Sequence, residues 1–161
     1  MLLLHLQGDY LSQLVPAAAM KLANEMDQGA GGQLQRQVWH AWNTPADIVQ
    51  WNAASDDWHT TKSAVDLRIG GTFSSRMEAK DGSMGFDFAG TYTKVVEHSL
   101  IESTFGGRVL MVEFVAEHGG VTVRESFDAE TTYPIEQQRQ GWQAILANFA
   151  KHVEARGTLS V

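Results

Sequence analysis

The chain has 161 residues, a length that suits one domain with its own core rather than two domains. Apolar residues make up 43% and charged residues 19% of it, a composition typical of a globular fold and unlike a disordered or coiled-coil chain. The formal charge of -7 disfavours a nucleic-acid partner, and the absence of cysteine excludes disulfides, thiolate nucleophiles and Cys-ligated metals.

The first residues give a weak signal for a targeting segment. The apolar run at residues 2–6 is interrupted by His5 and has no positive charge ahead of it, and no later run is long enough to span a bilayer. We therefore expect a cytoplasmic protein without a membrane partner. Apolar residues at helical spacing then predict a helix over residues 9–27, followed by a glycine-rich linker, QGAGGQ, at residues 28–33. Residues 1–33 are thus predicted to form an irregular N-terminal extension.

The main domain is predicted to span residues 34–156, and residues 157–161 a short tail. Leu34, Val38 and Trp42 lie on one face of a second helix, and Pro45 begins a short third one that ends near Trp51. After Asp57 the pattern changes to short alternating runs separated by glycine pairs or Asp-Gly, which is typical of an antiparallel meander. The predicted strands cover residues 59–69, 72–80, 84–96, 100–105, 109–117 and 121–129.

The last predicted element is a long helix over residues 132–154. Pro134 begins it, and Trp142, Ile145 and Phe149 lie on one stripe that would pack against the sheet. We expect Trp142 and Phe149 to be buried there.

Several stretches of the chain resemble a known family. Residues 57–92 (DWHTTKSAVDLRIGGTFSSRMEAKDGSMGFDFAGTY) and 134–149 (PIEQQRQGWQAILANF) are similar to bacterial relatives of the activator of 90-kDa heat-shock protein ATPase. These relatives belong to the SRPBCC or START-like superfamily, which also contains polyketide cyclase-like proteins. The resemblance runs from Val38 to Glu154. It implies an α+β helix-grip fold, in which a curved antiparallel sheet wraps around a long C-terminal helix and leaves a cavity.

The chain departs from the family pattern upstream of residue 38. The family opens with an alternating strand before its first helix, whereas residues 24–37 contain no β-branched residue. Three alternatives follow: a nearby run such as residues 2–6 replaces the strand, the sheet lacks it, or the segment is unrelated to the fold. An unpaired sheet edge would allow a homodimer, and deleting residues 1 to about 30 would then have little effect on stability.

Strand alternation predicts which side chains face the long helix. The apolar residues assigned to the inner face are Val65, Leu67, Ile69, Phe73, Met77, Met84, Phe86, Phe88, Tyr92, Val109, Met111, Val115, Val121, Val123 and Phe127. The polar residues assigned to it are His59, Ser75, Glu113 and Glu125. Arg76, Glu78 and Asp87 are assigned to the outer face as a charge cluster, unless a β-bulge inverts the alternation.

These assignments give a set of candidate site residues. The predicted ligand-binding residues are His59, Ser75, Met77, Phe86, Phe88, Tyr92, Met111, Glu125, Trp142, Ile145 and Phe149. His59 and Glu125 are also the candidates for a catalytic acid or base. The six histidines never occur at i and i+4 or in an HExxH frame, so no metal site is predicted. The glycine pairs lie between predicted strands rather than between a strand and a helix, so no nucleotide cofactor is predicted either.

Three functions remain open at this point. An apolar cavity with few polar groups favours binding of a small hydrophobic molecule such as a lipid, an aromatic compound or a polyketide. A cyclase- or hydrolase-like enzyme could use the same cavity if His59 or Glu125 reached a bound carbonyl group. The family name instead suggests a co-chaperone-like module that acts through its surface, and fold analogy alone does not decide among the three.

Overall fold

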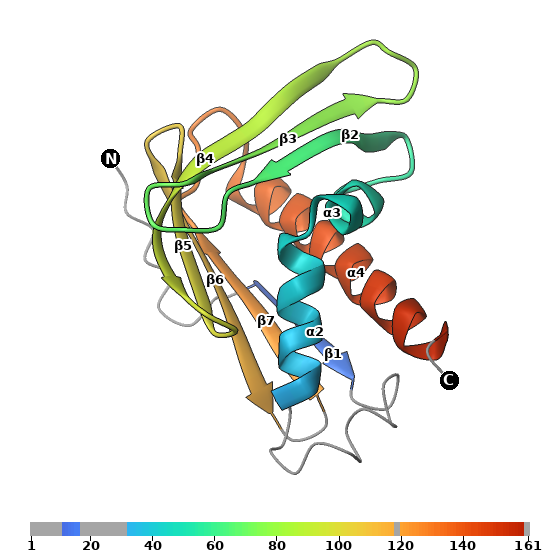
Figure 1. Cartoon of the computed structure of the whole chain (residues 1–161). Helices are drawn as coiled ribbons and strands as arrows, with labels where there is room; N and C mark the ends of the chain where they lie inside the picture. The colour runs from blue at the N-terminus through green and yellow to red at the C-terminus, as the bar shows by residue number, and fades with distance from the viewer. Residues whose placement is uncertain (1–10, 17–31, 118–119, 160–161) are drawn as a thin grey trace.

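The computed structural model describes residues 11–16, 32–117 and 120–159, shown in colour in Figure 1. The elements in chain order are β1 (Leu11–Pro16), α2 (Gly32–Asn43), α3 (Pro45–Trp51), β2 (Trp58–Val65), β3 (Thr72–Ala79), β4 (Gly85–Val96), β5 (Leu100–Phe105), β6 (Arg108–Glu117), β7 (Gly120–Phe127) and α4 (Ile135–Leu159). The strands form one antiparallel sheet in the order β1-β7-β6-β5-β4-β3-β2. Figure 1 shows this sheet bending around α4, with α2 and α3 beside α4 on the same side. The predicted α+β helix-grip fold is confirmed.

The meander forms because tight turns join consecutive strands. Between β5 and β6, Gly106 and Gly107 have φ angles of 55° and 76°, the left-handed conformation that a two-residue hairpin turn requires and that glycine adopts without steric cost. This turn places Phe105 directly opposite Arg108. Since opposite residues share a face of the sheet, the turn also determines which residues of β6 face α4.

The core is sealed at the C-terminal half of α4. Leu146, Phe149 and Val153 are at most 2% exposed and lie on the helix face toward the sheet. Two tryptophans pack edge-on against the Phe149 ring, Trp42 with a centroid distance of 4.9 Å and Trp51 with one of 5.0 Å. The predicted burial of Phe149 is therefore confirmed, and α2 and α3 are fixed to α4 by aromatic contacts.

Polar contacts also hold α3 in place. Asp47 is only 6% exposed, and its Oδ1 lies 2.8 Å from His152 Nε2 of α4. Arg156 Nη1 donates a second hydrogen bond to the same oxygen. The Trp51 indole N–H donates to the carbonyl of Ala41 at 3.1 Å. These partners stabilise a buried carboxylate and fix the short helix that carries Trp51.

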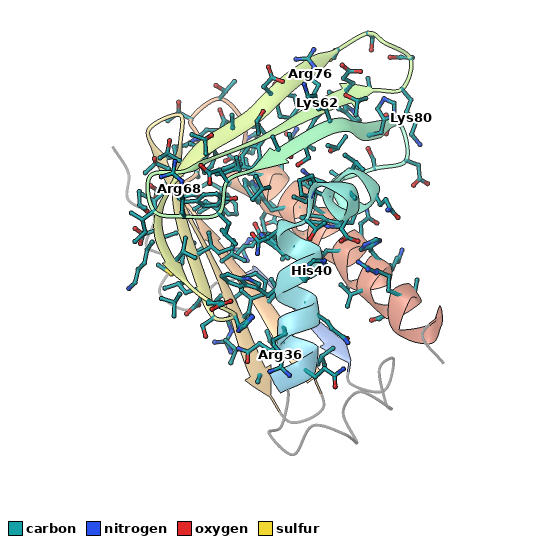
Figure 2. All side chains as sticks on the ribbon, in the orientation of Figure 1. Arg36, His40, Lys62, Arg68, Arg76 and Lys80 are labelled. Atoms are coloured by element: carbon teal, nitrogen blue, oxygen red, sulfur yellow. The ribbon has the colours of Figure 1, made fainter. Side chains whose placement is uncertain are left out.

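The predicted charge cluster lies on the convex face. Arg76 Nε is 3.1 Å from Glu78 Oε1, and its Nη1 is 3.6 Å from Oδ1 of Asp87, the residue directly opposite on β4. Figure 2 shows Arg76 on the side of the β3–β4 hairpin that points away from α4. All three side chains are at least 38% exposed, so the ion pairs contribute little to stability.

The prediction of a helix over residues 9–27 is wrong at residues 11–16, which form the edge strand β1. This strand pairs with β7, from Leu11 opposite Glu125 to Pro16 opposite Gly120, and it also contacts α4. The apolar residues Leu11, Leu14 and Val15 recur at helical spacing, so the local pattern favours a helix, and the free edge of β7 decides in favour of a strand. The missing first strand is thus supplied within the predicted extension. The rest of the predicted helix and the linker up to residue 31 lie outside the described residues.

The C-terminal boundary also differs from the prediction. Helix α4 continues to Leu159, so residues 157–159 extend the helix rather than form a tail.

We expect β1 to be integral to the sheet, contrary to the expectation that deleting residues 1–30 has little effect on stability. Deleting residues 1–16 exposes the backbone groups of β7, and should lower the free energy of unfolding by at least about 2 kcal/mol and promote self-association. Urea unfolding and size-exclusion chromatography measure these two effects. Deletion of residues 1–10, which keeps β1, is the control; equal stability of the two truncated proteins would contradict the role of β1.

Candidate functional site

A cavity of about 500 Å³ lies between the sheet and the N-terminal half of α4. Strands β2 to β7 line its sheet side, and α2, α3, the loop after α3 and the start of α4 complete its walls. The lining becomes exposed between the start of α4 and the β3–β4 hairpin, where Tyr133 is 57% and Phe86 48% exposed. The cavity therefore opens to solvent at that place.

Aromatic rings form much of the wall. Trp142 of α4 stacks on Phe127 of β7, with a centroid distance of 4.8 Å and an interplanar angle of 17°. Its other neighbours are Phe88 at 5.8 Å and Phe105 at 6.0 Å, which meet each other edge-on at 5.2 Å. This group gives the cavity a rigid apolar surface of the kind that binds small molecules.

A few polar groups interrupt the apolar wall. Ser63 Oγ and Ser75 Oγ of neighbouring strands are 3.3 Å apart, and Ser103 of β5 is 2% exposed. Burial first, and the nearby charge of Asp66 second, raise the pKa of the Tyr92 phenol well above its usual value. These groups are neutral at physiological pH and can bind a ligand by hydrogen bonds without a charge.

Glu125 is the exceptional residue of this site. Its side chain is 1% exposed, it lines the cavity, and its Oε2 has no hydrogen-bond partner among the described residues. The neighbours on its face of the sheet are apolar: Val123 and Phe127 along β7, and Val112 directly opposite on β6. Burial raises the pKa of its carboxyl group from the ordinary value of 4.5 to about 8. Glu125 therefore holds a proton at neutral pH and is an uncharged donor.

The structure brings most of the predicted ligand-binding residues together. Those that line the cavity are Ser75, Met77, Phe86, Phe88, Tyr92, Glu125, Trp142 and Ile145. Three do not line it: His59, Met111 and Phe149. Phe149 belongs to the sealed core described above, whereas the other two were assigned to the wrong face. Trp142 is half-buried because one side of it faces the cavity.

A β-bulge displaces His59 from the cavity. The pairing of β2 with β3 shifts between Thr60 and Lys62, so residues before and after the bulge have opposite alternation. Trp58 and Thr60 consequently face inward at the start of β2, while Ser63 and Val65 do so after the bulge. His59 lies instead in a separate surface groove with Lys80, Asn148, Lys151 and His152.

The alternation predicted for β6 is wrong. Leu110, Val112 and Phe114 are buried, whereas Val109 is 39% exposed and Met111 lies on the other face. Glu113 shares that outer face, opposite Arg124 of β7. Both sets of residues on β6 are largely apolar, so alternation alone could not decide between them. The two-residue turn at Gly106 and Gly107 is the feature that decides. It pairs Phe105 with Arg108, so both side chains lie on the inner face, and the other even-numbered residues of β6 then lie there too.

Sequence reasoning missed several lining residues. Trp42, Trp51 and Trp58 come from α2, α3 and the start of β2, and Arg108 from the β5–β6 hairpin. The Arg108 guanidinium lies 4.3 Å above the Phe105 ring. The alternation of residues along strands gives no information about tryptophans on α2 and α3. The signal that was available is that the apolar faces of these two helices must pack against the rest of the domain.

Gly141 lines the cavity from within α4. A Cβ atom built there meets no other heavy atom within 4 Å, so close packing does not require a glycine. Its φ angle is not positive, so backbone conformation does not require one either. A glycine inside a helix costs about 1 kcal/mol relative to alanine. The remaining consequence of Gly141 is open space beside Trp142.

The family model for "Activator of Hsp90 ATPase homolog 1-like protein" matches residues 35–154 of this chain. The chain belongs to this family. Its structure is similar to that of an activator of Hsp90 ATPase homolog 1-like protein from Aeromonas hydrophila, at 44% identity, with 93% of this chain and 95% of that one covered and a TM-score of 0.75. A protein from Cytophaga hutchinsonii is 40% identical, with 91% and 92% covered and a TM-score of 0.68.

More distant similarity supports the fold alone. A protein from Nitrosomonas europaea is 16% identical and has a TM-score of 0.71 over 92% of this chain. No curated protein matches the chain significantly. Among the described residues of this chain, no helix is both long and apolar enough to cross a membrane. The same residues contain no group of three His, Asp or Glu side chains close enough together to hold a metal ion.

We expect Glu125→Gln to remove a pH dependence from stability. The folded protein retains a proton that the unfolded chain releases, so its stability should fall as pH rises from 4.5 to about 8 and level off above that. Glutamine does not ionise. Over this pH window, the free energy of unfolding of the variant should therefore rise relative to that of the wild type by about 1.4 kcal/mol for each pH unit.

Urea unfolding at several pH values measures this difference. Glu113→Gln, the same substitution on the outer face of the neighbouring strand, is the matched control, and its free energy of unfolding should follow the same pH profile as that of the wild type. Parallel pH profiles for the wild type and Glu125→Gln would show that Glu125 is not buried as described.

Proposed function

We propose that this protein binds a small hydrophobic ligand, such as a lipid tail, an aromatic compound or a polyketide, in the cavity between the sheet and α4. The observation that carries the proposal is the cavity itself, about 500 Å³ in volume and lined by four of the five tryptophans: Trp42, Trp51, Trp58 and Trp142. Well-packed proteins leave few voids, and a cavity of this size is in the range of small-molecule sites.

Membership of the family supports a ligand-binding type of domain. The cavity walls add a chemical preference. Large aromatic and aliphatic side chains line the sheet side and the Trp142 face, where the polar groups are mainly serine hydroxyls, the Tyr92 phenol and the carboxyl group of Glu125. Gly141 supports the same proposal, because it lowers helix stability and leaves space at the cavity wall.

An enzyme of the cyclase or hydrolase kind is the second candidate. One observation favours it: the carboxyl group of Glu125 is protonated near neutral pH, as a general acid must be. The other predicted catalytic residue, His59, lies outside the cavity in the surface groove. The described neighbours of Glu125 on its face of the sheet are Val112, Val123 and Phe127, none of which is a nucleophile or a base. They give weaker support to catalysis than to binding, so binding is the function proposed.

We expect Gly141→Leu to fill the cavity and abolish binding without unfolding the protein. The neutral probe N-phenyl-1-naphthylamine should quench the tryptophans of the wild type saturably, and the variant should bind at least about tenfold more weakly. The free energy of unfolding should stay equal or rise by up to about 1 kcal/mol, because leucine favours a helix more than glycine does.

Ala144→Leu is the matched control, since Ala144 lies one turn along the same helix and does not line the cavity. This variant should bind the probe as the wild type does. Unchanged binding by Gly141→Leu would place the probe elsewhere on the surface. Ser75→Phe, which narrows the cavity from the sheet side, is a second test from the opposite wall.

A further inference from the structure

Glu125 combines two features that no other described residue shares. The buried side-chain oxygens without a hydrogen-bond partner are Oε1 of Gln37 and Oε2 of Glu125, and of these two residues only Glu125 lines the cavity. An unpaired polar group in an apolar environment lowers the stability of the fold unless another molecule supplies the partner. The arrangement is therefore incomplete without a ligand atom.

We propose that the ligand carries an uncharged hydrogen-bond acceptor, such as a ketone or ester carbonyl oxygen, and that the carboxyl O–H of Glu125 donates a hydrogen bond to this atom. The inference rests on the proposed function and adds the chemical class of the ligand to it. Glu125 would then select among hydrophobic molecules of equal shape by the presence of that oxygen.

The surroundings of Glu125 favour a neutral acceptor over an amine. Pairing an ammonium group with Glu125 requires the ionised carboxylate, and ionising Glu125 places a charge among Val112, Val123 and Phe127. Burial is the one cause that raises the pKa of this carboxyl, with no contribution from a charged group of the described residues. A carbonyl ligand leaves Glu125 and its apolar neighbours without a charge.

The other ionisable groups of the cavity lie on different elements. The described ones that line it are Tyr92 of β4, Arg108 of β6, and Glu130 and Tyr133 from the segment before α4. Arg108 lies over Phe105 and donates to the carbonyl of Asp128 at 3.5 Å. On the cavity side, α4 contributes Gln137, Gln138, Trp142 and Ile145, and α2 contributes Trp42 and Asn43, none of which titrates. Arg124 precedes Glu125 on β7 and faces the opposite side of the sheet.

Two probes that differ in a single oxygen test the proposal. They are 2-acetylnaphthalene, which has a carbonyl oxygen, and 2-ethylnaphthalene, which has nearly the same shape without it. Titration of tryptophan fluorescence measures both affinities. At about pH 6 the wild type should prefer the ketone by about tenfold or more after correction for the solubility of each probe, because the ketone satisfies the buried donor.

The variants separate a donor from a charge. Glu125→Gln keeps an N–H donor of similar shape and should retain the preference for the ketone, whereas Glu125→Leu should lose it. The wild type should also lose the preference at about pH 9.5, where the ionised carboxylate no longer donates, while Glu125→Gln keeps it. Glu113→Gln on the outer face is the control and should behave as the wild type.

Each outcome supports or overturns the inference. Equal affinity for the two probes at about pH 6 overturns it and leaves the proposed hydrophobic site intact. Loss of the preference in Glu125→Gln, or its persistence in the wild type at high pH, also overturns the donor role. If neither naphthalene binds, the proposed function itself fails. The pH comparison needs no variant, so it still decides the question if Glu125→Leu does not fold.

Discussion

The contact between α4 and the concave face of the sheet is the constraint on which the other features depend. A single long helix covers the concave face of a seven-stranded sheet. Its side chains pack closely in the C-terminal half, where Leu146, Phe149 and Val153 are buried. Toward its N-terminal half the curved sheet and the helix stay apart, and Trp142 bridges them by stacking on Phe127. The cavity follows from this geometry, and α2 and α3 cover its inner end with Trp42 and Trp51.

Features that lower the stability of the fold coincide in this cavity. Gly141 weakens α4, Ser103 and Ser75 are polar residues at buried positions, and Glu125 has a buried oxygen with no partner among the described residues. Packing explains none of them, since a larger apolar side chain at these positions would fill the void. The proposed apolar ligand with an acceptor oxygen would account for all of them, because it would fill the space and supply a hydrogen-bond partner for Glu125 Oε2.

The sequence predicts most of this fold because turns and periodicity agree along β3, β4 and α4, where Ser75, Phe88 and Trp142 were placed correctly. Its failures have local causes. A single inserted residue after Thr60 reverses the alternation along β2 and removes His59 from the cavity. Both faces of β6 are largely apolar, so alternation assigned Met111 to the wrong face. Residues 11–16 form a strand because β7 offers them an edge, which is a tertiary effect that no local pattern contains.

The central claim is that the buried carboxyl group of Glu125 is uncharged at neutral pH because no described residue pairs with its Oε2. A direct NMR titration of the side-chain carboxyl carbon of Glu125, assigned by comparison with Glu125→Gln, tests this claim. The account predicts a midpoint of about 8, and a further increase when 2-acetylnaphthalene is bound. A midpoint near the ordinary value of 4.5 would contradict it, because the carboxylate would then be solvated or paired.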